Sequence, residues 1–271
     1  FEFGLIPMDT FLFIILTLFM LTVLVVVHEF GHFIVAKRAD IYVIEFAIGM
    51  GPMLFSHQEK ETRLTIRALP IGGFCRMWGE AESSGDGLAD EAVSGPNLPA
   101  NRSFMHLSKG RKMLVLLAGP AMNFVLAVLT MMAVYLLGGH GAASAIKGAF
   151  ASVAQFTTAI YQSFRMIFAG QAGLNDFAGP VGLVGMVGSF YRYGLRAMLS
   201  FTAFISVNLG VLNLLPLPAL DGGQILIAAI EAIIRRDLDP EKAAWINGIG
   251  FAALMALAVV IAVNDVLRYL H

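Results

Sequence analysis

The chain has 271 residues, of which 58% are hydrophobic and only 14% are charged, and its mean hydropathy is +0.76. This composition excludes an ordinary soluble domain and indicates a polytopic membrane protein. The net charge of −1 gives no indication of nucleic-acid binding, and a single cysteine, Cys75, excludes a disulfide framework or a cysteine zinc site. The first apolar run lacks a basic leader and a small-residue cleavage site, so we expect no cleavable signal peptide.

The first predicted membrane helix covers about residues 10–36 and contains the motif HEFGH at 28–32. Positions i and i+4 share one face of a helix, so His28 and His32 can bind one metal ion. Glu29 lies beside them and can act on a metal-bound water. Ionisable groups inside a spanning helix are costly, which favours a functional interpretation. Pairs with this spacing also occur by chance, so the histidines alone leave the question open.

The region 37–112 is polar and holds ten of the eighteen Lys and Arg residues. The positive-inside rule therefore places it in the cytoplasm and the N-terminus outside. An apolar stretch, Ile41–Phe55, and an alternating one, Arg63–Leu69, together predict a small sheet or hairpin that partly dips toward the membrane. Residues 80–101 are acidic and rich in Gly, Ser and Pro, and we expect them to be irregular.

The second predicted span covers about 113–137 and is followed by a ten-residue connector, Gly138–Lys147. In 148–169, large apolar residues recur every three or four positions among polar ones. This spacing predicts an interfacial amphipathic helix rather than a span. The glycine-rich stretch that follows, up to residue 196, is predicted to be a loop.

The third predicted span, about 197–234, is broken around Pro216 and Pro218, and the fourth covers about 245–267. Non-helical backbone at membrane depth is tolerated only where protein buries it or it lines a wet cavity. Asp221 follows the break and has two possible roles. It could cap the next helix, or it could be the third protein ligand that catalytic zinc usually takes. We favour the ligand.

The predicted fold class is an all-α polytopic membrane protein with about four transmembrane helices, a small membrane-associated β hairpin or sheet and an interfacial amphipathic helix. We expect a first half of the core at 1–137, a second half at 197–271, and 138–196 between them. Intramembrane His and Asp also suit an ion pathway, so a membrane metal-ion transporter or metal-binding protein is the alternative function. The position of Glu29 between the histidines favours hydrolysis.

The motif HEFGH, followed far downstream by NLLPLPALDGG at 213–223, resembles the site-2 protease family of intramembrane zinc metalloproteases. The similarity is closest to its bacterial RseP/RasP-type branch. Four further stretches are similar to that branch and occur in the same order: EFAIGMGP at 45–52, LPIGGF at 69–74, AGPAMNF at 118–124 and SVNLG at 206–210.

The resemblance implies a multi-pass protease of the bacterial inner membrane. The Lys and Arg residues clustered in 37–112 indicate that both termini are extracytoplasmic and that the active site lies near the cytoplasmic side. Its partners would be the lipid bilayer and transmembrane substrates such as anti-sigma factors or signal-peptide remnants. Members of this branch carry PDZ domains between the second and third core spans, and the connector 138–147 is too short for one. A substrate helix must unwind before cleavage, and a strand edge within 41–55 could pair with it.

The resemblance also implies roles for individual residues. Zn²⁺ would be bound by His28, His32 and Asp221, and Glu29 would be the catalytic residue. Contacts with the substrate or its reacting carbonyl would come from positions on other elements, namely Asn208, Asn213, Gly49 and Gly51. Asn123, in the second span, is open to two interpretations: an interhelical hydrogen bond or support of the active site.

Overall fold

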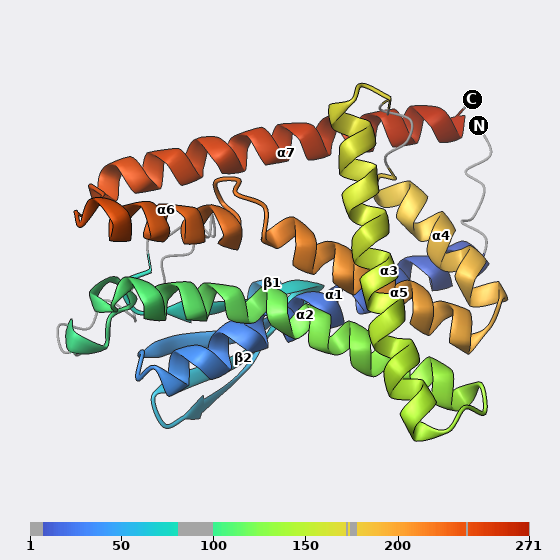
Figure 1. Cartoon of the computed structure of the whole chain (residues 1–271), viewed down its shortest axis with the longest axis horizontal. Helices are drawn as coiled ribbons and strands as arrows, with labels where there is room; N and C mark the ends of the chain where they lie inside the picture. The colour runs from blue at the N-terminus through green and yellow to red at the C-terminus, as the bar shows by residue number, and fades with distance from the viewer. Residues whose placement is uncertain (1–7, 81–99, 172, 174–177, 237, 271) are drawn as a thin grey trace. The chain divides into compact units, whose positions relative to one another are not determined.

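The computed structural model describes residues 8–80, 100–171, 173, 178–236 and 238–270, so most of the predicted irregular stretch 80–101 lies outside the described residues. The described residues form seven α-helices, two long strands and two short 3-10 segments, Ala100–Arg102 and Phe104–His106 (Figure 1). Four helices are long and apolar enough to cross a membrane, and they are α1 (Met8–Arg38), α2 (Lys109–Leu137), α5 (Leu195–Asn213) and α7 (Pro240–Leu270). The predicted fold class is confirmed.

The chain forms two compact units, which we describe separately. The first unit comprises 1–21, 124–211 and 253–271, and the second comprises 22–123 and 212–252. All predicted site residues except Asn208 belong to the second unit.

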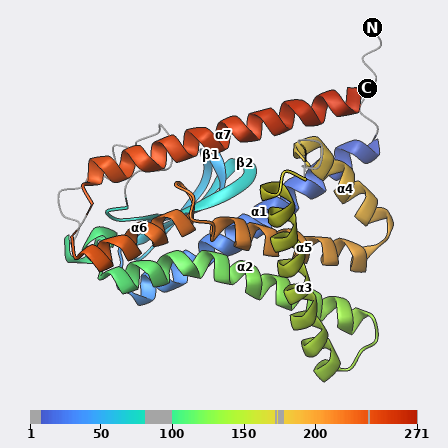
Figure 2. The same cartoon turned by 45° about the horizontal axis from the view of Figure 1, so that its top comes forward.

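The second unit contains an antiparallel pair of long strands, β1 (Val43–Glu59) and β2 (Thr62–Met77), as the sequence predicted. The register shows that each strand contributes two arms to a curved sheet (Figure 2). Residues 45–48 pair with 73–76 on one side and 63–66 on the other. Within the stretch 41–55, residues 45–48 therefore have no free edge. Residues 73–77 are paired on one side only and form an outer arm of the sheet.

The sheet bends between the arms of β1 at two glycines. Gly49 and Gly51 have φ angles of +85° and +81°, a region that disfavours residues with a side chain. A Cβ atom on Gly49 would also lie 2.5 Å from the carbonyl oxygen of Leu69 on β2. The sequence forms this sharp tip because both positions lack a side chain.

The sheet packs against the C-terminal half of α1 and the N-terminal half of α2. The buried cluster between them consists of Ala36, Ile41, Val43, Phe46, Cys75, Met77, Phe104, Val115 and Leu116. The rings of Phe33 on α1 and Phe46 on β1 lie 5.3 Å apart, centroid to centroid. Burial of Cys75 in this cluster agrees with its predicted role as a small apolar residue.

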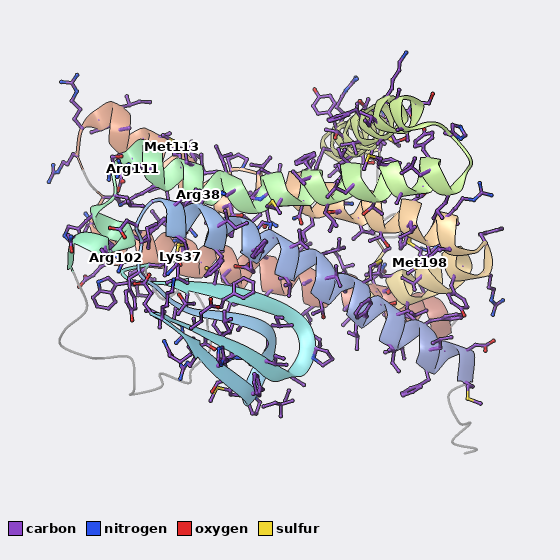
Figure 3. The ribbon with its side chains drawn as sticks, turned by 90° about the horizontal axis from the view of Figure 1, so that it is seen from below. Lys37, Arg38, Arg102, Arg111, Met113 and Met198 are labelled. Atoms are coloured by element: carbon purple, nitrogen blue, oxygen red, sulfur yellow. The ribbon has the colours of Figure 1, made fainter. Side chains whose placement is uncertain are left out.

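The end of α1 is held by a cluster of charged groups. Arg102 donates two hydrogen bonds to the Glu61 carboxylate, at 2.7 and 2.8 Å, and Lys37 donates a third. Figure 3 shows the labelled side chains of Lys37 and Arg102 near each other at this end of the helix. The hydrogen bonds from Arg102, with a further contribution from Lys37, lower the pKa of Glu61 to about 2.

The second unit also contains the continuation of the third predicted span. Helix α5 ends at Asn213, residues 214–220 are not helical, and α6 runs from Asp221 to Ile234. The break lies where Pro216 and Pro218 predicted it, because a proline inside a helix removes a hydrogen bond and clashes with the preceding turn.

In the first unit, α3 (Ala142–Phe168) crosses α5 steeply (Figures 1 and 2) and is not among the candidate spans. One stripe of this amphipathic helix is buried with residues of α2 and α5, and the cluster comprises Ala127, Met131, Ala149, Val153, Ile160, Ala203 and Val207. Phe156 and Phe204 pack edge to face, with centroids 5.5 Å apart. The apolar face that the sequence predicted is thus covered largely by protein.

The predicted glycine-rich loop before α5 is wrong in part, because residues Pro180–Arg192 form the helix α4. Pro180 occupies a first-turn position, where its fixed φ favours a helix start. The N–H of Gly182 donates to the buried carboxylate of Asp265 on α7 at 2.7 Å. A Cβ atom on Gly188 would lie 2.6 Å from the ring of Phe13. The glycines permit close packing here and do not mark a loop.

We predict that Glu61→Gln lowers stability at neutral pH but not at strongly acidic pH. The pKa of Glu61 is lowered in the folded state. The stabilisation is therefore complete above the unfolded pKa of about 4.5 and is lost as the pH falls toward 2. Thermal unfolding in detergent should show a gap on the order of 1 kcal/mol between wild type and variant at pH 7. A gap of equal size at pH 3 would contradict this assignment.

Candidate metal centre

Helix α1 carries both histidines on one face, as their spacing predicted. His28 and His32 are each only 6% exposed, and their Nε2 atoms lie 3.1 Å apart. The two rings meet edge to face. Both imidazoles therefore direct the same nitrogen toward one point inside the second unit.

The other nitrogen of each ring is held by α2. His32 Nδ1–H donates to the backbone carbonyl oxygen of Val115 at 2.8 Å. The side-chain amide of buried Asn123 lies against His28 Nδ1, with its Nδ2 atom 3.0 Å away. The amide oxygen and nitrogen exchange places when the amide turns over, and with Oδ1 in this place the amide would accept the Nδ1–H. Hydrogen bonds at Nδ1 leave the Nε2 lone pairs available to a metal ion, and such contacts commonly orient histidine ligands. Of the two interpretations of Asn123, the contact favours support of the site.

Asp221 completes the group from a third helix. Its Oδ2 lies 3.0 Å from His28 Nε2 and 3.5 Å from His32 Nε2. Asp221 is the first residue of α6, whereas the cap position is Leu220 and shows no side-chain cap hydrogen bond. The capping role left open by the sequence is therefore not the one observed.

The three residues fit a zinc ion. Tetrahedral zinc with bonds of about 2.0–2.1 Å keeps its ligand atoms roughly 3.3 Å apart. The three separations here are 3.0, 3.1 and 3.5 Å. Asp221 Oδ2 is buried and finds no hydrogen-bond partner in the described structure, as expected of an atom that binds a cation. Two imidazoles and one carboxylate also leave a fourth position for water or substrate.

Glu29 lies beside this group and is held by the sheet. Its Oε2 accepts a hydrogen bond from the backbone N–H of Cys75 at 3.1 Å. Cys75 belongs to the outer arm 73–77 of β2, so this edge of the sheet faces the carboxylate. No feature of the sequence identified a backbone N–H as the partner of Glu29.

Sequence reasoning did not identify Gly119 of α2 as a site residue. A Cβ atom there would lie 2.2 Å from His32 Nε2 and 2.7 Å from His28 Nε2. On the facing helix, a Cβ on Gly31 would lie 2.3 Å from the carbonyl oxygen of Ala118. The two glycines let α1 and α2 approach closely and leave space for the imidazoles. The only available signal was a Gly-Pro pair inside a spanning helix.

The loop 214–220, which precedes Asp221, is held by α7. Asn247 Oδ1 accepts a hydrogen bond from the N–H of Ala219 at 3.4 Å. A Cβ atom on Gly250 would lie 2.3 Å from Cβ of Pro218. A Cβ on Gly222 would likewise meet the carbonyl oxygens of Leu214 and Leu215 at 2.3 Å. These contacts explain why small residues flank the broken helix.

The remaining predicted site residues are not brought into the metal centre by an observed contact. Asn213 is half-buried at the end of α5, eight residues before Asp221. Gly49 and Gly51 form the tip of the sheet. Asn208 lies on the part of α5 that belongs to the first unit. The roles of these four residues stay predictions.

Residues 16–257, most of the chain, match peptidase family M50. The chain belongs to this family. The protein is 26% identical to zinc metalloprotease RasP of Geobacillus kaustophilus, with 91% of this chain and 96% of the relative covered. It is also 26% identical to the regulator of sigma-W protease RasP of Bacillus subtilis, with 90% and 96% covered. The prediction of a site-2 protease is confirmed.

A protein of Clostridium perfringens whose name describes a zinc metalloprotease is 30% identical, with 94% of this chain and 99% of the relative covered. The chain is therefore a zinc metalloprotease with Zn²⁺ as its cofactor, as the sequence predicted. The alignments with the two RasP proteins extend over 402 and 404 residues, so those relatives contain sequence without a counterpart among these 271 residues.

We predict that Gly119→Ala loses the metal. The added methyl group would overlap both Nε2 atoms, so the ligands could not converge. Zinc content of the purified variant, by elemental analysis, should fall well below one ion per chain. Gly110→Ala is a matched control on the same helix, because a Cβ there meets nothing within 4 Å. Full zinc occupancy in folded Gly119→Ala would contradict the described crossing of α1 and α2.

Proposed function

We propose that this zinc metalloprotease hydrolyses a peptide bond in or near the transmembrane segment of membrane-protein substrates, and that His28, His32 and Asp221 hold its zinc. The convergence of two Nε2 atoms and one buried carboxylate oxygen within 3.5 Å of each other carries the proposal. Its location supports an intramembrane reaction, because both histidines lie on a helix long and apolar enough to span the bilayer.

Zinc supplies the Lewis acid of such a site, which activates a water and polarises the scissile carbonyl. Glu29 would move the proton from the attacking water to the leaving amine, since its carboxylate is adjacent to the ligands but accepts a hydrogen bond from Cys75 rather than joining them. Asn123 and the Val115 carbonyl keep the imidazoles oriented during the reaction. Asn213 and Asn208 remain the candidates for contact with the reacting carbonyl.

The substrate must present an extended backbone to this site, because hydrogen bonds within a helix shield its peptide carbonyls. The outer arm 73–77 is suited to hold such a backbone, since it is an edge of the sheet. Its residue Cys75 donates a backbone N–H to Glu29. An unwound segment that adds to this edge as a further strand would lie beside the carboxylate. Exposed apolar residues near the tip, including Leu54 and Phe55, suit a sheet that dips into the bilayer.

The distribution of charge supports a cytoplasmic active site with both termini extracytoplasmic. Ten of the eighteen Lys and Arg residues lie in 37–112, directly after the site on α1. Figure 3 shows Lys37, Arg38, Arg102 and Arg111 together at this end of the second unit. We place the protein in a bacterial cell membrane, with substrates such as anti-sigma factors or signal-peptide remnants.

The alternative of a metal-ion transporter predicts a series of metal sites. Among the described residues, only His28, His32 and Asp221 form a group of three or more side chains able to hold a metal ion. A single site with an adjacent carboxylate supports hydrolysis instead.

We predict that Glu29→Gln abolishes cleavage of single-span peptides while zinc stays bound, because Glu29 moves protons and does not ligate. Products are measured by mass spectrometry and zinc by elemental analysis. His32→Ala and Asp221→Ala should lose zinc as well as activity, since each removes one of three ligands. Turnover by Glu29→Gln above about 1% of wild type would exclude Glu29 as the general base, which normally contributes about 10²–10⁴-fold.

We predict that a cysteine at position 60 is labelled from the cytoplasmic side and one at position 141 from the outer side. Lys60 lies in the turn between β1 and β2, and a side chain on Gly141 would meet nothing within 4 Å. Labelling with a membrane-impermeant maleimide before and after permeabilisation reports each side, and buried Cys75 gives the background. Labelling of both positions from one side would overturn the proposed topology.

A further inference from the structure

A buried ion pair lies inside the sheet, and the chemistry proposed above makes no use of it. Glu45 on β1 is completely buried and Arg67 on β2 is 7% exposed. Arg67 Nη2 donates to Glu45 Oε1 at 2.8 Å. Removing two charges from water costs several kcal/mol for each ion, so a buried pair is weak evidence for stability alone. Its geometry indicates what else it does.

The Glu45 carboxylate is held from the neighbouring arm of the sheet. Thr65 Oγ1 donates to Oε1 at 2.6 Å, and Arg63 Nη2 lies 3.3 Å from Oε2. Thr65, Arg63 and Arg67 all belong to β2, whereas Glu45 belongs to the arm of β1 that has partners on both sides. The carboxylate is therefore a fixed acceptor at the centre of the sheet.

The Arg67 guanidinium connects that acceptor to two further parts of the sheet. Its Nη1 donates to the carbonyl oxygen of Gly51 at 2.9 Å. Its Cζ lies 4.9 Å from the centroid of the Phe74 ring. One planar group thus contacts the glycine tip, the central arm and the outer arm, and its rigid fork fixes their spacing.

The outer arm leads directly to the catalytic carboxylate. Phe74 precedes Cys75, whose N–H donates to Glu29 Oε2 at 3.1 Å. A shift of this arm would move both the partner of Glu29 and the edge to which an unwound substrate would add. The tip is otherwise joined to β2 by the pairing of Met50 with Leu69, and its glycines Gly49 and Gly51 allow many backbone conformations.

We propose that Arg67 and Glu45 are positioning residues for substrate, which hold the tip and the outer arm 73–77 in register with Glu29. The proposal rests on the function proposed above. The pair acts through the sheet and touches neither the metal ligands nor the reacting atoms. Its loss should therefore weaken productive binding of an extended substrate and leave zinc binding intact.

The decisive variant is Arg67→Lys, which keeps the positive charge but cannot reach Glu45 and Gly51 together through a fork. We expect full zinc content and a fall in kcat/KM of about tenfold or more, expressed mainly as a higher KM. Arg63→Lys is the graded control, since Arg63 is more exposed and makes the longer contact with the same carboxylate. Its loss should stay below about threefold.

A second variant keeps the test valid if Arg67→Lys folds poorly. Arg67→Met with Glu45→Met removes both charges, a change that buried pairs often tolerate without loss of stability. This double variant should be folded and zinc-loaded yet show the same rise in KM, because the bond to Gly51 is still missing. Normal KM in either folded variant would overturn the proposal, as would equal losses in Arg63→Lys and Arg67→Lys.

Hydrogen exchange separates failure of this inference from failure of the proposed function. In wild type we expect slow exchange of the amides of 73–77, and at least tenfold faster exchange in Arg67→Lys, whether or not a peptide is cleaved. Unchanged exchange would overturn the inference alone. If the exchange difference is present but wild type cleaves no peptide, the proposed function is contradicted. The inference that Arg67 positions the edge then still holds.

Discussion

The close approach of α2 to α1 is the constraint on which the metal centre depends. Because Gly31 and Gly119 have no side chains, the backbones of α1 and α2 come close together, and the two imidazoles of α1 fit against α2. The same helix supplies both partners of the Nδ1 atoms, the Val115 carbonyl oxygen and Asn123. A wider crossing would leave these nitrogens without partners and let the rings rotate, which would weaken metal binding.

Several buried polar groups in the described structure are held from a second element. Asp221 reaches the histidines because the helix breaks before it and α7 supports the loop through Asn247 and Gly250. Asp265 accepts the N–H of Gly182 in the first turn of α4, where a carboxylate is favoured by the helix dipole. In an apolar chain these contacts specify geometry, because apolar packing is non-directional and an unpaired polar group is costly.

Structural features that depend on a local sequence pattern were predicted correctly. Apolar length predicted the four spanning helices, the prolines predicted the break before Asp221, and the alternation around Arg63–Leu69 predicted the sheet. Prediction failed at α4, since glycines that normally mark a loop here permit close helix packing. It also missed the buried pairing of Glu45 with Arg67, because partners twenty-two positions apart become neighbours only through strand register.

The sequence by itself determined the membrane class of the chain, the shared helical face of His28 and His32, and the family. Residue type and spacing of three to four positions suffice for such features. Only the tertiary structure decided that Asp221 joins the histidines rather than capping α6, that Gly119 makes room for them, and that the Cys75 N–H faces Glu29. Those facts depend on helix crossing and strand register, which bring distant residues and backbone atoms together and leave no local mark in the sequence.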